Sequence, residues 1–265
     1  MTTLHGIDVS KWNDKINWQA VAGAGVKFAF VRAGTGKTQG GFTLDPKFAI
    51  NVNGAHENGI AVGVYLYSYA RSVAAAQKEA VMMLAAIEAY RDKITWPVVY
   101  DIEEDAQAQL GPSICTAMCS AFCETVRQAG YTPMVYCNAH WYKDNLLPQN
   151  IHADFWIARW TTKAPESIPY TVWQYTDSGG VAGINGHVDL DISHVDYGKM
   201  PENAEDLDQQ LPDEPPEPEP KDEADGWAQD AWKAAYIAGV MDGTRPFDPV
   251  RREELAVVLQ RLGLI

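Results

Sequence analysis

Hydrophobic positions in the first 150 residues gather in short runs that alternate with longer amphipathic segments. The short runs are apolar or β-branched, a pattern typical of buried strands. The segments between them repeat apolar residues every three or four positions, which predicts helices. The predicted strands are 4–9, 27–33, 60–67, 98–103 and 132–137, and the predicted helices are 17–24, 46–58, 72–90, 113–128 and 139–146.

The pattern changes after these units. Three further strands are predicted at 154–160, 171–175 and 188–192, and the Pro- and Gly-containing loops between them are too short for full crossover helices. Repeated strand–helix units imply parallel strands with right-handed crossovers, and eight strands are enough to close a barrel. The predicted fold class is therefore α/β, with residues 1–200 forming an irregular TIM-like (β/α)5(β)3 barrel whose last third is poor in helix.

The composition shifts abruptly after residue 200. Eleven acidic residues and one lysine fall between 202 and 225, so this segment carries −10 of the net charge of −14. Alternating proline and acid favours an extended, self-repelling spacer, and we interpret 201–225 as a linker. Two short helical patterns around a Gly- and Pro-bearing turn follow in 226–265. So small a helical module buries little core alone and is expected to dock or self-associate.

Charge and composition exclude several function classes. No basic face is evident that could neutralise phosphates, which argues against a nucleic-acid partner. No stretch approaches the roughly 20 apolar residues of a spanning helix, and the first residues lack a signal-peptide pattern, so we expect a protein made in the cytoplasm without a membrane partner. Cys115, Cys119 and Cys123 share one helical face and Cys137 lies in an apolar strand. This arrangement favours core packing over a metal site, and no metal or cofactor is expected.

Acidic residues stand at the ends of several predicted strands. In α/β barrels the chemistry collects at the carboxyl ends of the strands. Asp8 closes the first strand, Asp101 and Glu103 the fourth, and Asp189 and Asp191 the eighth. Since the first and eighth strands of a closed barrel are neighbours, we expect Asp8 beside Asp189, with the fourth strand facing them across the mouth. Asp8, Asp101, Glu103 and Asp189 would then ring one opening.

Asp101 and Glu103 also form a candidate acid/base pair, because side chains two apart on a strand point to one face. A plainer explanation exists for each acid. The Asp-x-Glu pair could be a solvated strand end, and the others could cap loops or pair with Arg32 or Arg159. Aromatic residues at or near the strand ends could form the stacking walls of a ligand site or could simply fill core; they are Tyr65, Tyr67, Tyr136, Trp160, Trp173 and Tyr175.

Four motifs together resemble the glycoside hydrolase family 25 lysozymes over roughly residues 4 to 197. They are Gly6-Ile-Asp8-Val-Ser10-Lys-Trp12, Phe30-Val-Arg32-Ala, Val99-Tyr100-Asp101-Ile-Glu103 and Val188-Asp189-Leu. The resemblance implies a muramidase that cuts the β-1,4 bond between N-acetylmuramic acid and N-acetylglucosamine in peptidoglycan glycan strands. It places the general acid on Glu103, with Asp101 beside it and Asp8 and Asp189 completing the acidic ring.

The role of the second carboxylate stays open at this stage. Asp101 could orient the substrate's own 2-acetamido group as nucleophile, or one of the acids could activate water. One departure is that the third strand reads Tyr65-Leu66-Tyr67, where many relatives have a Tyr-His-Phe-like stretch. A subsite role of that histidine is therefore not carried over, whereas the acids are unaffected.

The tail resembles one S-layer homology repeat, through Gly239-Val-Met-Asp-Gly, Phe247-Asp-Pro249 and Arg252-Glu-Glu254-Leu. Such repeats commonly occur in threes, and Arg251 stands here where a threonine is frequent. Binding to a secondary cell-wall polymer, homo-oligomerisation and a stabilising appendage all remain open for this module.

Two functional classes follow from the sequence. One is a peptidoglycan hydrolase, in the context of a phage endolysin that reaches the wall through a holin pore. The other is a non-catalytic wall-binding or assembly protein. The complete set of acids favours the enzyme.

Overall fold

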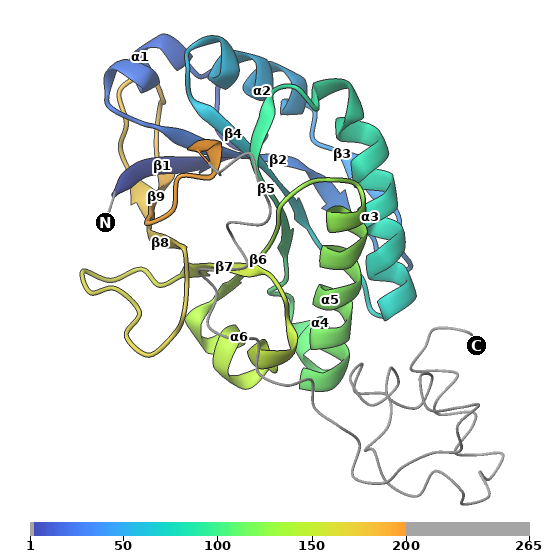
Figure 1. The fold of residues 1–265 in the computed structure, drawn as a ribbon. Coiled ribbons are helices and arrows are strands. Elements are labelled where there is room, and N and C mark those ends of the chain that lie inside the picture. The colour runs from blue at the N-terminus through green and yellow to red at the C-terminus, as the bar shows by residue number, and fades with distance from the viewer. Residues whose placement is uncertain (1–2, 200–265) are drawn as a thin grey trace, which may run out of the picture.

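The computed structural model describes residues 3–199, and these form a closed barrel (Figure 1). Neighbouring strands run in the order β1-β9-β8-β7-β6-β5-β4-β2-β3, and a further pairing of β1 with β2 closes eight of them into a ring. The predicted eight-stranded α/β barrel is therefore confirmed. The strands are β1 (Leu4–Val9), β2 (Phe28–Gly36), β3 (Phe42–Leu44), β4 (Ala61–Tyr67), β5 (Ile94–Asp101), β6 (Pro133–Asn138), β7 (Asp154–Ala158), β8 (Val172–Gly179) and β9 (Val188–Ser193).

Helices lie on the outside of the barrel, and each of the five predicted helices is present (Figure 1). They are α1 (Trp18–Gly23), α2 (Phe48–Glu57), α3 (Val73–Ile87), α5 (Pro112–Gln128) and α6 (Ala139–Asp144); the predicted helix 72–90 finishes in a 3-10 turn, η1 (Glu88–Tyr90). Side-chain caps explain two of the starts, because Asn17 and Ser72 accept hydrogen bonds from the backbone N–H groups three residues on.

Besides the 3-10 turns η2 (Pro148–Asn150) and η3 (Tyr197–Lys199), two short elements were not predicted. Strand β3 forms a hairpin with the end of β2, which extends past its predicted limit to Gly36. Helix α4 (Asp105–Ala108) is a single turn just after β5. Elements this short carry too little periodicity for a pattern to reveal them.

Strand β9 corrects one expectation about the rim. It pairs antiparallel with both β8 and β1, whereas the other barrel pairings are parallel. Asp189 therefore does not close its strand but stands near its beginning. Because the chain returns from β8 without a crossover helix, the amino end of β9 reaches the same rim as the carboxyl ends of the parallel strands.

The barrel interior is filled mainly by aromatic side chains. Phe28 stacks on Trp96 with ring centroids 4.2 Å apart, and Phe30 stacks on Trp156 at 4.5 Å. These four rings belong to one buried cluster, while a larger apolar cluster lies between the strands and the helices. The filled interior leaves the mouth of the barrel as the place for a ligand.

The cysteines lie where the core-packing interpretation expects them. Cys115, Cys119, Cys123 and Cys137 are buried and unpaired. No group of His, Cys, Asp or Glu within residues 3–199 is arranged to hold a metal ion, and no helix in that range is long and apolar enough to cross a membrane. The predicted linker 201–225 and the helical module 226–265 lie outside the described residues.

Candidate active site

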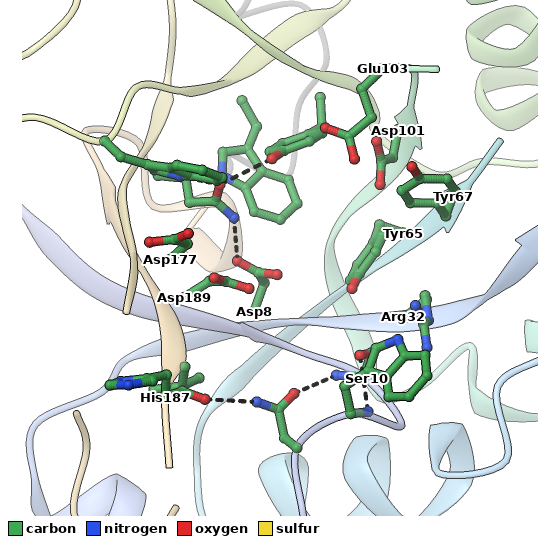
Figure 2. A pocket seen from close by; sticks show the side chains of 17 residues that line it. Asp8, Ser10, Arg32, Tyr65, Tyr67, Asp101, Glu103, Asp177, His187 and Asp189 are labelled. Carbon is green, nitrogen blue, oxygen red and sulfur yellow. Dashed lines mark hydrogen bonds between the residues drawn. The ribbon is translucent and has the colours of Figure 1, made fainter. Parts of the chain in front are cut away.

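A cleft of about 450 Å³ opens at the mouth of the barrel, and all four predicted acids line it. Figure 2 shows Asp8 and Asp189 together on one side and Asp101 and Glu103 on the other, with Tyr65 between the two groups. The side chains come from β1, β9, β5 and the loop after β5, so barrel closure brings together residues that are far apart in the sequence. The expected acidic ring is present.

Asp8 and Asp189 face each other across the β1–β9 ladder, where they are register partners. Burial raises the pKa of Asp8 well above its ordinary value, and the negative charges of Asp189 and Asp191 raise it further. Burial also raises the pKa of Asp189, to about 6, with a further contribution from the charge of Asp177. The pair is therefore suited to hold a proton near neutral pH.

Asp101 and Glu103 face Asp8 and Asp189, but strand β5 ends at Asp101, so Glu103 lies in the following loop rather than on the predicted strand. That loop is anchored through its backbone. The indole N–H of Trp141 donates to the carbonyl oxygen of Glu103 at 3.0 Å, and the N–H of Ile102 donates to the carbonyl oxygen of Tyr136 at 3.1 Å. The segment that carries Glu103 is thus held from the β6–α6 side of the cleft.

Burial raises the pKa values of both carboxyls. For Asp101 the neighbouring charge of Glu103 adds to the effect of burial, and the guanidinium of Arg32 opposes it. For Glu103 the hydroxyl of Tyr67 opposes burial, whereas the charges of Glu104 and Asp189 raise the pKa further. Asp101 is 4% exposed, and its Oδ1 has no hydrogen-bond partner among the described residues. Oδ1 itself is buried, but Asp101 lines the cleft, so the residue borders the space that a ligand would fill.

Arg32 is not an ion-pair partner of any of the four acids. Its guanidinium is buried and binds Asp45, with Nη2 at 2.7 Å and Nε at 2.8 Å from the same carboxylate oxygen. Asp45 also accepts from the backbone N–H of Lys11 and of Lys47. The other candidate, Arg159, donates to the carbonyl oxygen of Ala164. Within residues 3–199 no ion pair neutralises any of the four acids.

The predicted aromatic residues divide into two groups. Tyr65, Tyr67, Tyr136 and Trp160 line the cleft, but Trp173 and Tyr175 do not. The indole of Trp173 instead donates to the carbonyl oxygen of Arg159 at 2.9 Å, and its ring contacts that of Tyr175. The predicted substrate-binding role of these two residues therefore has no support from the cleft geometry.

Sequence reasoning overlooked several residues of the cleft, and Trp12 and Gln174 are two of them. Trp12 is 78% exposed at its rim, and its place in the Asp8-to-Trp12 motif was a usable signal. Gln174 is buried and connects three side chains: its amide nitrogen donates to Asp8 at 2.7 Å, and its amide oxygen accepts from Tyr136 and Trp160. No sequence pattern pointed to Gln174, because its role depends on packing between distant strands.

A second hollow of about 350 Å³ shares Glu103, Tyr136 and Trp160 with the first. Asn138 and Arg159 are among its other lining residues. Glu103 therefore borders space on both sides, and an extended ligand could run past it from one hollow to the other. A protonated carboxyl in this position can deliver a proton to a bond that spans the two hollows.

The model of Glycosyl hydrolases family 25 matches residues 7–184 of the chain. The uncharacterized protein YegX of Escherichia coli O157:H7 is 33% identical over 198 residues, which cover 72% of this chain and 69% of YegX. Lysozyme M1 of Streptomyces globisporus is 29% identical, with coverage of 70% and 66%.

The modular autolysin LytC of Streptococcus pneumoniae, solved in complex with a synthetic peptidoglycan ligand, superposes with a TM-score of 0.61 at 29% identity. The match covers 72% of this chain and 46% of LytC, so this chain corresponds to less than half of that protein.

Proposed function

The chain belongs to glycosyl hydrolases family 25, and from this premise we propose that it is an N-acetylmuramidase. Its substrate is the glycan strand of peptidoglycan, cut at the β-1,4 bond between N-acetylmuramic acid and N-acetylglucosamine. The observation that carries the proposal is the convergence of Glu103, Asp101, Asp8 and Asp189 on one cleft. The lysozyme name of one relative and the peptidoglycan ligand of LytC support the same substrate class.

Glu103 is the proton donor in this proposal. A general acid must still hold its proton at the working pH, and burial together with the charges of Glu104 and Asp189 raises the pKa of Glu103 in that direction. The proton passes to the glycosidic oxygen as the bond from that oxygen to the anomeric carbon breaks. The leaving sugar then departs as a neutral alcohol, and Glu103 is left as a carboxylate.

Asp101 acts on the sugar whose anomeric carbon becomes positive. Asp101 lines the cleft, and its carboxylate can accept the N–H of the 2-acetamido group and so direct the acetamido oxygen toward the anomeric carbon. Alternatively, Asp8 or Asp189 removes a proton from an attacking water. The first route retains the anomeric configuration and the second inverts it, so proton NMR of the initial product distinguishes them.

Digestion of purified peptidoglycan tests the activity. After borohydride reduction, a muramidase yields muramitol at the new chain ends, whereas a glucosaminidase would yield glucosaminitol. A protein that only binds glycan would sediment with the sacculi and release no reducing ends. Either of these last two results would overturn the proposal.

The proposal extends to a lytic role as an endolysin released through a holin pore from the cell that makes it. Co-expression in a Gram-positive host tests this role. A fall in culture turbidity is expected with chain and holin together, and unchanged lysis in the absence of the holin would contradict it.

Residues 226–265 are proposed to bind a secondary cell-wall polymer or to join copies of the chain, on the strength of their resemblance to an S-layer homology repeat. The full chain should then sediment with native walls and lose this binding when the polymer is stripped with hydrofluoric acid. Light scattering on the same sample separates self-association from wall binding. A monomer that binds both wall preparations equally would contradict both roles.

A further inference from the structure

The environment of Glu103 contains a hydrogen-bond donor that two carboxylates can reach. Tyr67, the last residue of β4, donates its hydroxyl proton to Oε1 of Glu104 at 2.6 Å. Tyr67 is also the register partner of Asp101 on the neighbouring strand and lines the same cleft as Glu103, whose pKa its hydroxyl lowers. A phenol carries one proton and can donate it to only one carboxylate at a time. Glu103 and Glu104 therefore compete for Tyr67.

Tyr67 itself stays protonated throughout. Burial raises its pKa, and the hydrogen bond to Glu104 and the charge of Glu103 raise it further. Its hydroxyl can thus turn between two acceptors but is not a proton source. Figure 2 shows Tyr67 beside Asp101 and Glu103 at the edge of the cleft.

Glu104 is held firmly enough to act as a competing acceptor. It is the N-cap of α4, and its backbone N–H donates to the side-chain oxygen of Gln107 at 3.3 Å. Gln107 is 1% exposed, and its amide nitrogen donates to Ser68 Oγ at 3.2 Å and to the carbonyl oxygen of Ala70 at 3.1 Å. Ser68 follows Tyr67 in the chain, so one buried network fixes the segments that carry both Tyr67 and Glu104.

We propose that Tyr67 and Glu104 are positioning residues for the general acid, with the Tyr67 hydroxyl bound to Glu104 while Glu103 is protonated and turning to Glu103 once that proton has left. This inference rests on the proposed function for its catalytic meaning. In the first state the donor is withheld, so Glu103 keeps its proton. In the second state the Tyr67 hydroxyl stabilises the new carboxylate of Glu103. No covalent bond changes in Tyr67.

Other titratable and charged groups also face Glu103, and they are the same in every variant used below. They are Asp101 on its own segment, Asp8 from β1, Arg32 from β2, Tyr65 from β4, Tyr136 from β6, Asp177 from β8, His187 just before β9, Asp189 from β9, and His140 and Arg159 across the second hollow. Differences between variants therefore isolate the contribution of positions 67 and 104.

Two substitutions should move the titration of Glu103 in opposite directions. Tyr67→Phe removes the donor and should raise the pKa of Glu103 by about one unit, the usual effect of a hydrogen bond to a charged group. Glu104→Gln removes a nearby negative charge and weakens the competing acceptor, so it should lower the pKa of Glu103. A purely structural role of either residue would lower activity without opposite shifts.

The decisive measurement is the titration of the Glu103 side-chain carboxyl by ¹³C NMR in the full, unliganded chain, with the signal assigned from Glu103→Gln. Matched controls are Tyr69→Phe, which removes a phenol two residues away, and Asp105→Asn, which removes the next acid along the chain. Both controls should leave the titration of Glu103 in place. If Tyr67→Phe fails to fold, Glu104→Gln alone carries the test.

Shifts in the same direction, or no shift with Glu104→Gln, would overturn the inference. The pH dependence of glycan hydrolysis supplies the second readout. The alkaline limb of the pH–rate profile should move to higher pH with Tyr67→Phe and to lower pH with Glu104→Gln. Opposite NMR shifts in a chain that releases no reducing ends would leave the shared donor intact and refute the proposed function. Hydrolysis without opposite NMR shifts would refute the shared donor and leave the proposed function intact.

Discussion

Replacing Asp189 by Asn should make the protein more stable above pH 6 while weakening its activity. Asp189 lies opposite Asp8 on neighbouring strands, and directly opposed like charges destabilise a sheet. In the folded protein the pKa of Asp189 rises from its ordinary value of 3.8 to about 6, mainly through burial. The folded state therefore takes up a proton that the unfolded chain has already released in this pH window.

The magnitude follows from that shift. Full ionisation of Asp189 in the folded state costs about 3 kcal/mol for a pKa raised from 3.8 to about 6. The carboxyl is only partly buried, so solvent screening reduces the expected cost to about 1 to 2 kcal/mol. The penalty is absent below the unfolded pKa, develops as the pH rises toward 6, and is complete above it. The amide introduced by Asp189→Asn carries no charge at any pH, so the penalty should disappear in this variant.

Urea unfolding of the wild type and of Asp189→Asn at pH 3.5 and pH 8 measures this difference. We expect equal free energies of unfolding at pH 3.5 and a gain of about 1 to 2 kcal/mol for the variant at pH 8. Asp92→Asn, which removes an exposed acid after η1, should leave both values unchanged. A variant that is less stable at pH 8, or stabilised equally at both pH values, would refute the reasoning.

Two further predictions concern the buried ion pair and the exposed indoles. Asp45→Asn leaves the buried guanidinium of Arg32 without its counter-charge and should cost about 3 to 5 kcal/mol in urea unfolding; a loss below about 1 kcal/mol would contradict this. Trp12→Ala and Trp160→Ala remove indoles that are 78% and 57% exposed, so stability should change by less than about 0.5 kcal/mol. The KM for soluble glycan fragments should rise about 2- to 10-fold, and an unchanged KM would exclude both indoles from sugar stacking.

The barrel was predictable because its strands and helices have strong, distinct periodicities. The buried runs on β2, β4 and β5 and the amphipathic helix α5 each satisfy one pattern and no other. The direction of β9 was not predictable in the same way. The connection from β8 to β9 contains no crossover helix, and these strands are antiparallel. The connection from β7 to β8 also contains no helix, yet those strands are parallel. The lack of a helix therefore does not predict the strand direction.

The acidic ring was predictable because three of its acids stand at or next to a strand end and Glu103 follows β5 by two residues. Asp8 and Asp189 could be placed together from barrel closure alone, and the ladder makes them register partners. Partners in hydrogen-bond networks could not be predicted. Gln174 reaches Asp8 only because β9 pairs with both β8 and β1, and Tyr67 reaches Glu104 only because Glu104 is held as the N-cap of α4 after β5. Such contacts depend on side-chain positions that no local pattern encodes.

The rate at which Glu103→Gln releases reducing ends from purified peptidoglycan tests the central claim most directly. The substituted amide keeps the size of the side chain but cannot give up a proton to the glycosidic oxygen. We predict a loss of about a hundredfold or more with an unchanged circular dichroism spectrum, while Glu57→Gln on the exposed end of α2 keeps the wild-type rate. A folded Glu103→Gln variant that hydrolyses peptidoglycan at the wild-type rate would contradict the account.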